Sequence, residues 1–293
     1  MSRLEESLAV GKFVVTAELG PPKGTDVSHL LEMAELLRAR VDAINVTDQQ
    51  SSVMTLGSLA VCHLLHERGI EPIFQVTCRD RNRIALQSDL LSAAVLGIEN
   101  ILCLTGDYVT LGDHPQAKPV FDLDSVTLLR TVSLLQEGRD LAGKPLQGTP
   151  RFFPGAVVSP GARPLAPQIA KMEKKVEAGA RFFQTQAVYD PAQFESFVRQ
   201  VEYLHVPILV GIILLKSAAM ARFMNSNVAG VHVPESLIEE IGSVDKPNRP
   251  ARAVEIGARL IRQMKGMCQG IHIMTLGWEQ YVPQLLEEAG LSG

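Results

Sequence analysis

Six polar residues each lie near the end of a short apolar segment of this sequence: Glu18, Thr47, Gln75, Asp107, Gln186 and Thr275. Two of them, Glu18 and Asp107, are carboxylic acids. A glutamate that ends an otherwise apolar segment must be paired, or it keeps its proton near neutral pH and can serve as a general acid. For Thr47 or Thr275 alone, capping a helix or closing the end of the fold is favoured by roughly two to one.

The segment from Glu99 to Asp107 is the clearest example of the kind of element that positions these polar residues. It contains the apolar run Ile101 to Leu104 and ends in Thr105-Gly106-Asp107. So short a run, flanked by residues that break regular structure, predicts a strand buried on both faces in a parallel sheet covered by helices. Ligand-binding groups lie at the carboxyl ends of such strands, and a glycine there lets a ligand approach the backbone.

Strand-like and helix-like segments alternate along the whole chain. The predicted strands cover residues 12–19, 42–48, 72–78, 101–104, 152–158, 180–186, 207–215 and 270–276. The predicted helices cover roughly residues 26–40, 53–67, 83–96, 124–136, 167–177, 191–204, 217–224, 235–241, 249–264 and 279–288. This order predicts an α/β fold, a (β/α)8 TIM barrel that forms a single catalytic domain over residues 1–293. An open doubly wound sheet is disfavoured, because Glu18-Leu-Gly-Pro-Pro22 is not the glycine-rich fingerprint of that fold.

Composition limits the classes of function. The chain is 46% hydrophobic and 20% charged with a net charge of −4, which argues against a general nucleic-acid or anionic-membrane surface. Its first residues lack the apolar region of a signal peptide, and no long apolar run follows, so we expect a cytoplasmic protein. The cysteines are far apart, which indicates reduced core residues and no metal site: Cys62, Cys78, Cys103 and Cys268.

Three other features allow two interpretations each. Residues 108–120 lack periodicity and predict a loop over the catalytic face, in which His114 is either a lid residue or an ordinary loop histidine. Trp278 either stacks on a ring at the barrel mouth or packs against the last helix. Lys175 shares a helix with interleaved lysines and glutamates, a pattern that by itself predicts a solvated surface.

The motifs around these residues resemble the methylenetetrahydrofolate reductase family. This family consists of flavin-dependent (β/α)8 barrels that reduce 5,10-methylenetetrahydrofolate to 5-methyltetrahydrofolate. The resemblance covers nearly the whole chain and is to the short bacterial type, closest in character to the forms of acetogenic and related anaerobic bacteria. It rests on Glu18-x-x-Pro-Pro22, Gly106-Asp107, Asp124-Ser-Val-Thr-Leu-Leu129, Lys175-Val-Glu-Ala-Gly-Ala180 and Thr185-Gln186.

The resemblance implies a role for each matching residue. Glu18 would be the proton donor that protonates N10 of the substrate and opens its five-membered ring to an N5-iminium cation, which then accepts hydride from the reduced flavin. Asp107 would stabilise this cation and contact both flavin and folate, and Gln186 would hydrogen-bond the pterin. The positions at which the resemblance implies flavin contacts are occupied here by Thr47, Gln75, Thr105, Gly106, Asp107 and Lys175, although Gln75 and Thr105 differ from the usual residues.

Departures from the better-known bacterial pattern leave the cofactor and electron donor open. Gln75 stands where those enzymes have histidine, Thr105 where they have arginine, and Gln168 where they have aspartate. The grip on the adenosine half of FAD is weakened, so FMN is an alternative, with Lys175 or Arg163 holding a phosphate. The donor is either NAD(P)H or a partner subunit with an iron–sulfur or zinc centre, and we expect an oligomer.

The resemblance places this reaction in one-carbon metabolism, in methionine biosynthesis or the acetyl-CoA pathway. Two other classes of function stay open. One is a flavin-independent methyltransferase barrel that binds a pterin and would be colourless. The other is a non-catalytic flavin- or folate-binding subunit of a larger complex, against which Glu18 argues, because a structural subunit has little use for a carboxylic acid at that strand end.

Overall fold

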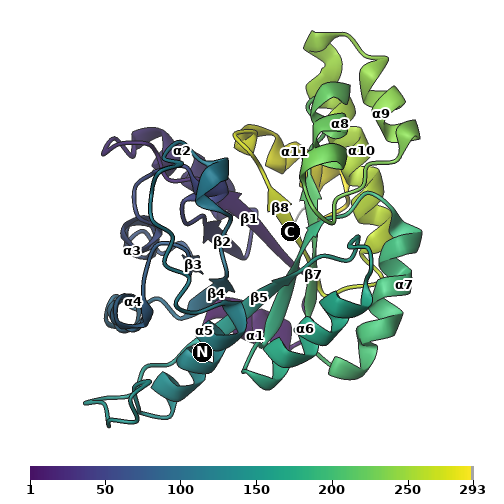
Figure 1. The fold of residues 1–293 in the computed structure, drawn as a ribbon. Coiled ribbons are helices and arrows are strands. Elements are labelled where there is room, and N and C mark those ends of the chain that lie inside the picture. Colours follow the sequence, from purple (N-terminus) through teal and green to yellow (C-terminus); the bar gives the residue numbers. More distant parts are fainter. Residues whose placement is uncertain (292–293) are drawn as a thin grey trace.

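Eight parallel strands close into a barrel surrounded by helices in the computed structural model, which describes residues 1–291 (Figure 1). The strands are β1 (Val14–Leu19), β2 (Ala43–Val46), β3 (Pro72–Thr77), β4 (Asn100–Leu104), β5 (Phe153–Val158), β6 (Phe182–Ala187), β7 (Ile208–Ile213) and β8 (Gly270–Met274). Each strand pairs with the next along the chain, and β8 closes the barrel by pairing with β1. The predicted TIM barrel is therefore confirmed, and each predicted strand overlaps an observed one.

The helices cover the outside of this barrel. They are α1 (Arg3–Ala9), α2 (Ser28–Arg38), α3 (Ser58–His66), α4 (Arg83–Val95), α5 (Ser125–Gln136), α6 (Ala166–Glu177), α7 (Pro191–Val201), α8 (Ala218–Asn227), α9 (Glu235–Gly242), α10 (Arg249–Met264) and α11 (Val282–Glu288). The α8–α9 pair is an addition between β7 and α10, at the upper right of Figure 1. Among the described residues, no helix combines the length and apolar character that crossing a bilayer requires.

Some predicted boundaries were wrong. The helix expected over residues 53–67 begins only at Ser58, because Val53 and Gly57, which follow a 3-10 turn, η1 (Gln50–Ser52), have extended backbone conformations. The helix expected over residues 191–204 leaves α geometry after Val201 and ends as a 3-10 turn. In both places the departure is local and does not disturb the strand order.

The lower half of the barrel interior is mostly apolar; the buried exception is Asn100 at the start of β4, whose Oδ1 accepts a hydrogen bond of 2.7 Å from Ser2 Oγ. Strand side chains alternate between the interior and the helix-covered outside, so alternate residues of each strand meet within the barrel. The ones that meet near the amino ends of the strands form a cluster that we call the barrel floor: Leu4, Val14, Ala43, Ile73, Leu102, Phe153, Phe182 and Leu209. Phe153 and Phe182 stack with ring centroids 5.1 Å apart. Leu4 belongs to α1, a helix that the sequence analysis did not predict.

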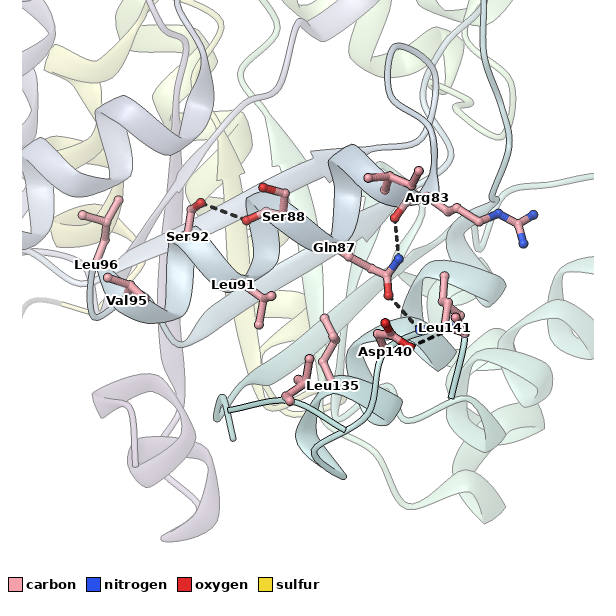
Figure 2. Close-up of a pocket in the computed structure, with 13 residues that line it drawn as sticks. Arg83, Gln87, Ser88, Leu91, Ser92, Val95, Leu96, Leu135, Asp140 and Leu141 are labelled. Atoms are coloured by element: carbon pink, nitrogen blue, oxygen red, sulfur yellow. Dashed lines mark hydrogen bonds between the residues drawn. The ribbon is translucent and has the colours of Figure 1, made fainter. Parts of the chain in front are cut away.

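A hollow of about 1050 Å³ lies on the outer surface of the protein, between α4 and the excursion that follows α5 (Figure 2). Leu91 and Val95 of α4 line one side, and Leu135 and Leu141 line the other. Gln87 spans the two sides, because its Oε1 accepts a hydrogen bond of 2.8 Å from the backbone N–H of Leu141. This hollow contains none of the residues at the carboxyl ends of the strands.

Candidate active site

A buried glutamate lies inside the barrel near the carboxyl end of β1. Glu18 is 8% exposed, and its Oε1 accepts a hydrogen bond of 3.0 Å from Nε2 of Gln75 on β3. Nε2 of His272 on β8 lies 3.4 Å from the same oxygen. The structure therefore brings together two of the predicted residues, Glu18 and Gln75, and adds His272, which the sequence analysis did not single out.

Further polar side chains lie in the barrel interior next to Glu18, Gln75 and His272. The amides of Asn45 on β2 and Gln184 on β6 donate to each other with distances of 2.9 Å in both directions. Because β2 and β6 are not neighbours in the sheet, this pair crosses the barrel interior. Gln184 Nε2 also donates to Thr16 Oγ1 at 3.2 Å. We call the connected set the polar tier: Thr16, Glu18, Asn45, Gln75, Gln184 and His272.

A cavity of about 380 Å³ opens at the barrel mouth, and Glu18, Thr47 and Thr275 are among the residues that line it. Oγ1 of Thr275 lies 3.0 Å from the backbone oxygen of Glu18 and 2.7 Å from Oε1 of Glu279, and its single proton can be donated to either. Thr275 therefore joins β8 to β1 and to the following turn, as the closure interpretation expects. Thr47 is buried beside the cavity, directly after β2.

The loop after β4 carries three predicted contacts. Oγ1 of Thr105 accepts a hydrogen bond of 3.2 Å from the N–H of Ser125, which ties this loop to the start of α5. Gly106 adopts a φ of 96°, and a Cβ there would lie 3.0 Å from Cβ of Arg79, so a side chain is excluded. Asp107 is exposed, and its Oδ2 accepts from the N–H of Ser51 at 3.1 Å. Asp107 thus lies on the rim, in a different cluster of contacts from Glu18.

A buried arginine and a partly buried one support this rim. The side chain of Arg79 is 1% exposed, pairs with Asp80, and donates to the backbone oxygen of Gln49 at 3.2 Å. Arg81 forms an ion pair with Asp48, the second residue after β2. These contacts connect the loops after β2 and β3. The sequence analysis missed them, although three consecutive charged residues directly after an apolar strand were a visible signal.

Lys175 is buried, which corrects the surface interpretation of its charge pattern. Lys175 belongs to α6, and its side chain points toward the barrel, where Nζ donates a hydrogen bond of 2.6 Å to the backbone oxygen of Val157 on β5. Burial lowers the pKa of Lys175 to about 8, and the charge of Lys171 acts in the same direction. A buried ammonium with three donors, satisfied by one carbonyl among the described residues, fits an anionic group such as a phosphate.

A second cavity lies between the loop after β4 and the start of α5. It has a volume of about 610 Å³ and is lined by Thr105, Gly106 and Asp124, together with neighbouring residues. The charge of Asp124 acts on Lys175, so the buried ammonium lies near this cavity. The described residues that line this cavity include the carboxylates of Asp122 and Asp124 and no cationic side chain, so a phosphate bound at this edge would depend on Lys175.

Gln186 lies half-buried near the end of β6, where the pairing of β6 with β7 shifts register between Gln184 and Ala187. Its Oε1 accepts from the N–H of Ala187 at 2.9 Å. At the same place a Cβ on Gly211 of β7 would lie 2.3 Å from the backbone oxygen of Thr185. The irregular pairing therefore holds Gln186 at the mouth, outside the hydrogen bonds of the polar tier.

The structure also shows the contacts of the two remaining features with alternative interpretations, His114 and Trp278. The loop over residues 108–120 lies against the loop after β2, where Asp113 Oδ1 accepts from the N–H of Met54 at 3.0 Å. His114 is an exposed loop residue whose Nδ1 lies 2.8 Å from Asp113. Trp278 packs edge-on against Tyr281 at the start of the last helix, with centroids 5.0 Å apart.

The cysteines are buried and unpaired, as the sequence analysis expected. Burial raises the pKa of the Cys78 thiol to about 12 and that of Cys268 to about 11. Such thiols stay protonated at neutral pH and are poor nucleophiles. In the part of the chain that the structure describes, no three histidine, cysteine, aspartate or glutamate side chains gather as a metal site would require.

A closed parallel barrel with a buried carboxylic acid and amides at the carboxyl ends of its strands belongs to the class of (β/α)8 barrel proteins whose ligands bind at that end. Within this class, the family model described as methylenetetrahydrofolate reductase matches residues 3–290. The chain therefore belongs to the methylenetetrahydrofolate reductase family.

Individual relatives are distant. The chain is similar to "Methylenetetrahydrofolate reductase 2" of Schizosaccharomyces pombe, with 27% identity over 76% of this chain and 36% of the relative. It is also similar to "Probable methylenetetrahydrofolate reductase (NADPH)" of Caenorhabditis elegans, with 22% identity over 81% of this chain and 35% of the relative. The chain thus spans about a third of the length of these two relatives.

Solved structures share the fold. An uncharacterized protein from Clostridium thermocellum, described as binding two copies of 5-methyl-5,6,7,8-tetrahydrofolic acid, superposes with a TM-score of 0.65 at 15% identity and covers 99% of both chains. A 2,3-dimethylmalate lyase superposes with a TM-score of 0.56 at 13% identity and covers 99% of this chain and 88% of that one. Barrels with other chemistry therefore share this fold, and function must be argued from the residues of the site.

Proposed function

We propose that this protein catalyses the flavin-dependent reduction of 5,10-methylenetetrahydrofolate to 5-methyltetrahydrofolate. The observation that carries the proposal is the buried carboxyl group of Glu18, held by Gln75 at the end of β1 where a barrel binds its ligand. Membership of the family supports the reaction, and the description of the Clostridium thermocellum protein supports a folate ligand for a barrel of this shape.

Glu18 is the proton donor in this proposal. Its carboxyl proton passes to N10 of the substrate, and the bond between N10 and the bridging carbon breaks. The bridging carbon then remains on N5 as an iminium cation and becomes a methyl group when a hydride adds to it. The buried carboxyl group, with the amide of Gln75 and the imidazole of His272 beside it, is held at the end of β1 where this proton would be transferred.

The other site residues bind and orient ligands in this proposal. A bound FAD, or FMN, would supply the hydride, with NAD(P)H or an electron-transfer partner containing an iron–sulfur or zinc centre as the source of electrons. Lys175 would hold a phosphate of the flavin, and Gln186 would hydrogen-bond the pterin. Asp107 would place a negative charge near the cation from the rim. Thr47, Gln75, Thr105 and Gly106 would complete the flavin contacts.

A reconstitution experiment tests this proposal. The purified chain is incubated with FAD and FMN separately, freed of excess flavin, and assayed for methylenetetrahydrofolate reduction alongside Glu18→Gln and Glu287→Gln. Glu287 is an exposed glutamate on α11 and serves as the matched control. We expect Glu18→Gln to keep the flavin absorbance and lose roughly 100-fold or more in turnover, the range typical of a general acid. A colourless protein that takes up neither flavin would contradict the redox function and leave folate binding alone.

A further inference from the structure

His272 is the one ionisable side chain that approaches the carboxylate of Glu18 from within the polar tier. Its Nε2 lies 3.4 Å from Glu18 Oε1, and its Nδ1 lies 2.9 Å from Oγ1 of Thr16. Both ring nitrogens of the imidazole therefore have a polar partner, and His272 is 3% exposed. Thr16 Oγ1 also lies 3.4 Å from the backbone oxygen of Ile271, so its proton has two possible acceptors.

These contacts allow two hydrogen-bonded arrangements that differ by one proton. In the first, the Thr16 hydroxyl donates to Nδ1 of His272, and Nε2–H donates to the ionised Glu18. In the second, Nδ1–H donates to Thr16, the Thr16 hydroxyl donates to the Ile271 oxygen, and the protonated Glu18 donates to Nε2. Each polar atom keeps a partner in both arrangements, so the pair can gain or lose a proton without leaving a buried group unsatisfied.

We propose that His272 is a positioning residue that shares one proton with Glu18 and returns a proton to it after each turnover. The inference rests on the function proposed above, because it concerns the reprotonation of the same carboxylate. When Glu18 has given its proton to N10 of the folate, solvent in the cavity that Glu18 lines supplies one proton to the pair; as an imidazolium, His272 passes this proton from Nε2 to Oε1 and keeps Nδ1–H on Thr16. His272 acts through Glu18 and has no role in holding the folate.

The surroundings leave the pair coupled mainly to each other. The polar neighbours in the barrel interior are uncharged: Gln75 of β3 contacts Glu18, and Gln184 of β6 contacts Thr16 and Asn45 of β2. Gly211 of β7 is opposite His272. The other ionisable groups that line the cavity are Asp26, His29 and Glu279, and Lys216 donates to the backbone oxygen of Leu276 and interacts with the charge of Glu279. Glu279 interacts through Thr275 with the backbone oxygen of Glu18 and has no recorded contact with its carboxylate among the described residues.

A spectroscopic experiment tests the sharing of the proton without relying on turnover. Side-chain ¹⁵N spectra of histidine are recorded against pH for the full chain and for Glu18→Gln, and the signals of His272 are assigned by their loss in His272→Gln. We expect the titration of His272 to move by about one pH unit or more when Glu18 becomes Gln, because one partner of the shared proton is lost. An unchanged titration of His272 would overturn the proposal.

A kinetic experiment separates positioning from a structural effect. The His272→Gln variant keeps an amide N–H near the position of Nε2 but cannot take up a proton, and His232→Gln, an exposed histidine between α8 and α9, is the control. We expect the His272→Gln variant to lose roughly tenfold or more in kcat near neutral pH and to recover toward wild type as the pH falls, with KM nearly unchanged. A loss of kcat by the same factor at every pH would show a structural role and overturn the proposal.

The two proposals fail in different ways. If Glu18→Gln leaves turnover intact, the proposed proton donor is wrong. If Glu18→Gln abolishes turnover while His272→Gln has the pH profile of the wild type, only the role of His272 is wrong.

Discussion

The two ends of the barrel interior are built from the same eight strands and differ completely in chemistry. The barrel floor is apolar and contains stacked rings, with Leu4 of α1 packed into it. The polar tier above it contains a carboxyl group, an imidazole and three amides, connected by hydrogen bonds. The floor gains free energy from burial, whereas a buried polar group is tolerated only when its hydrogen bonds are made. Stability and chemistry are therefore separated along the strand axis.

The largest effect on stability should come from the floor. Phe182→Ala removes a fully buried ring that stacks on Phe153 and lies against Gly155. Gly155 has no side chain that could fill the space left by the ring. We expect a loss of about 3–5 kcal/mol in the free energy of unfolding, measured by urea denaturation. Phe223→Ala, at a ring that is 60% exposed, is the control and should change it by less than about 0.5 kcal/mol. A loss of under about 1 kcal/mol for Phe182→Ala would contradict the role of the floor.

A smaller effect should come from the amide pair of the polar tier. Asn45→Ala or Gln184→Ala each leaves the other amide buried without its partner. The double variant removes both amides, so we expect it to lose about 1–3 kcal/mol less stability than the two single variants added together. Additive losses would show that the two amides contribute independently and that the tier is not a connected network.

The smallest change in the free energy of unfolding between successive measurements should come from Lys175, a buried cation outside the barrel interior, when the pH is raised in steps. Its pKa is lowered to about 8 from the ordinary value of 10.5, so between these values the unfolded chain binds a proton that the folded chain has released. Stability attributable to this residue therefore rises with pH across that window, by up to about 1.4 kcal/mol per pH unit. Lys175→Met should lack this rise in urea denaturation at stepped pH. Parallel pH dependences for the variant and the wild type would contradict the burial of the ammonium.

Inorganic phosphate offers a second test of Lys175. An anion bound next to the ammonium should raise its pKa again, so phosphate should stabilise the wild type and leave Lys175→Met nearly unchanged. Thermal unfolding with and without phosphate at constant ionic strength measures this difference. Equal stabilisation of both proteins would argue against Lys175 as a phosphate contact.

The strand order was predictable from sequence because each strand is a short apolar run closed by breaking residues, and this pattern depends on local composition. The helix α1 was missed because it is only seven residues long, and its place under the barrel follows from tertiary packing of Leu4. Glu18 could be found because a carboxylate is conspicuous in an apolar strand. His272 could also have been found, since it lies at an interior position of β8, but nothing local connects it with Glu18.

The rest of the site depended on contacts that no pattern encodes. The charge pattern of the helix around Lys175 predicts a surface position, and the resemblance to the reductase family singled out this lysine as a cofactor contact without predicting that it is buried. Asp107 follows a strand end as expected, yet its carboxylate bonds to the N–H of Ser51 on the rim. Which loop a rim residue reaches is set by loop conformation, for which the sequence gives little information.

The measurement that tests the central claim most directly is a single turnover under anaerobic conditions. The flavin-loaded protein is reduced until its visible absorbance is bleached, then mixed with 5,10-methylenetetrahydrofolate. We expect the flavin absorbance to return in the wild type and in Glu287→Gln, and to return roughly 100-fold or more slowly in Glu18→Gln, because the folate ring cannot open without the proton. Return of the absorbance at equal rates in wild type and Glu18→Gln would contradict the assignment of Glu18 as the proton donor.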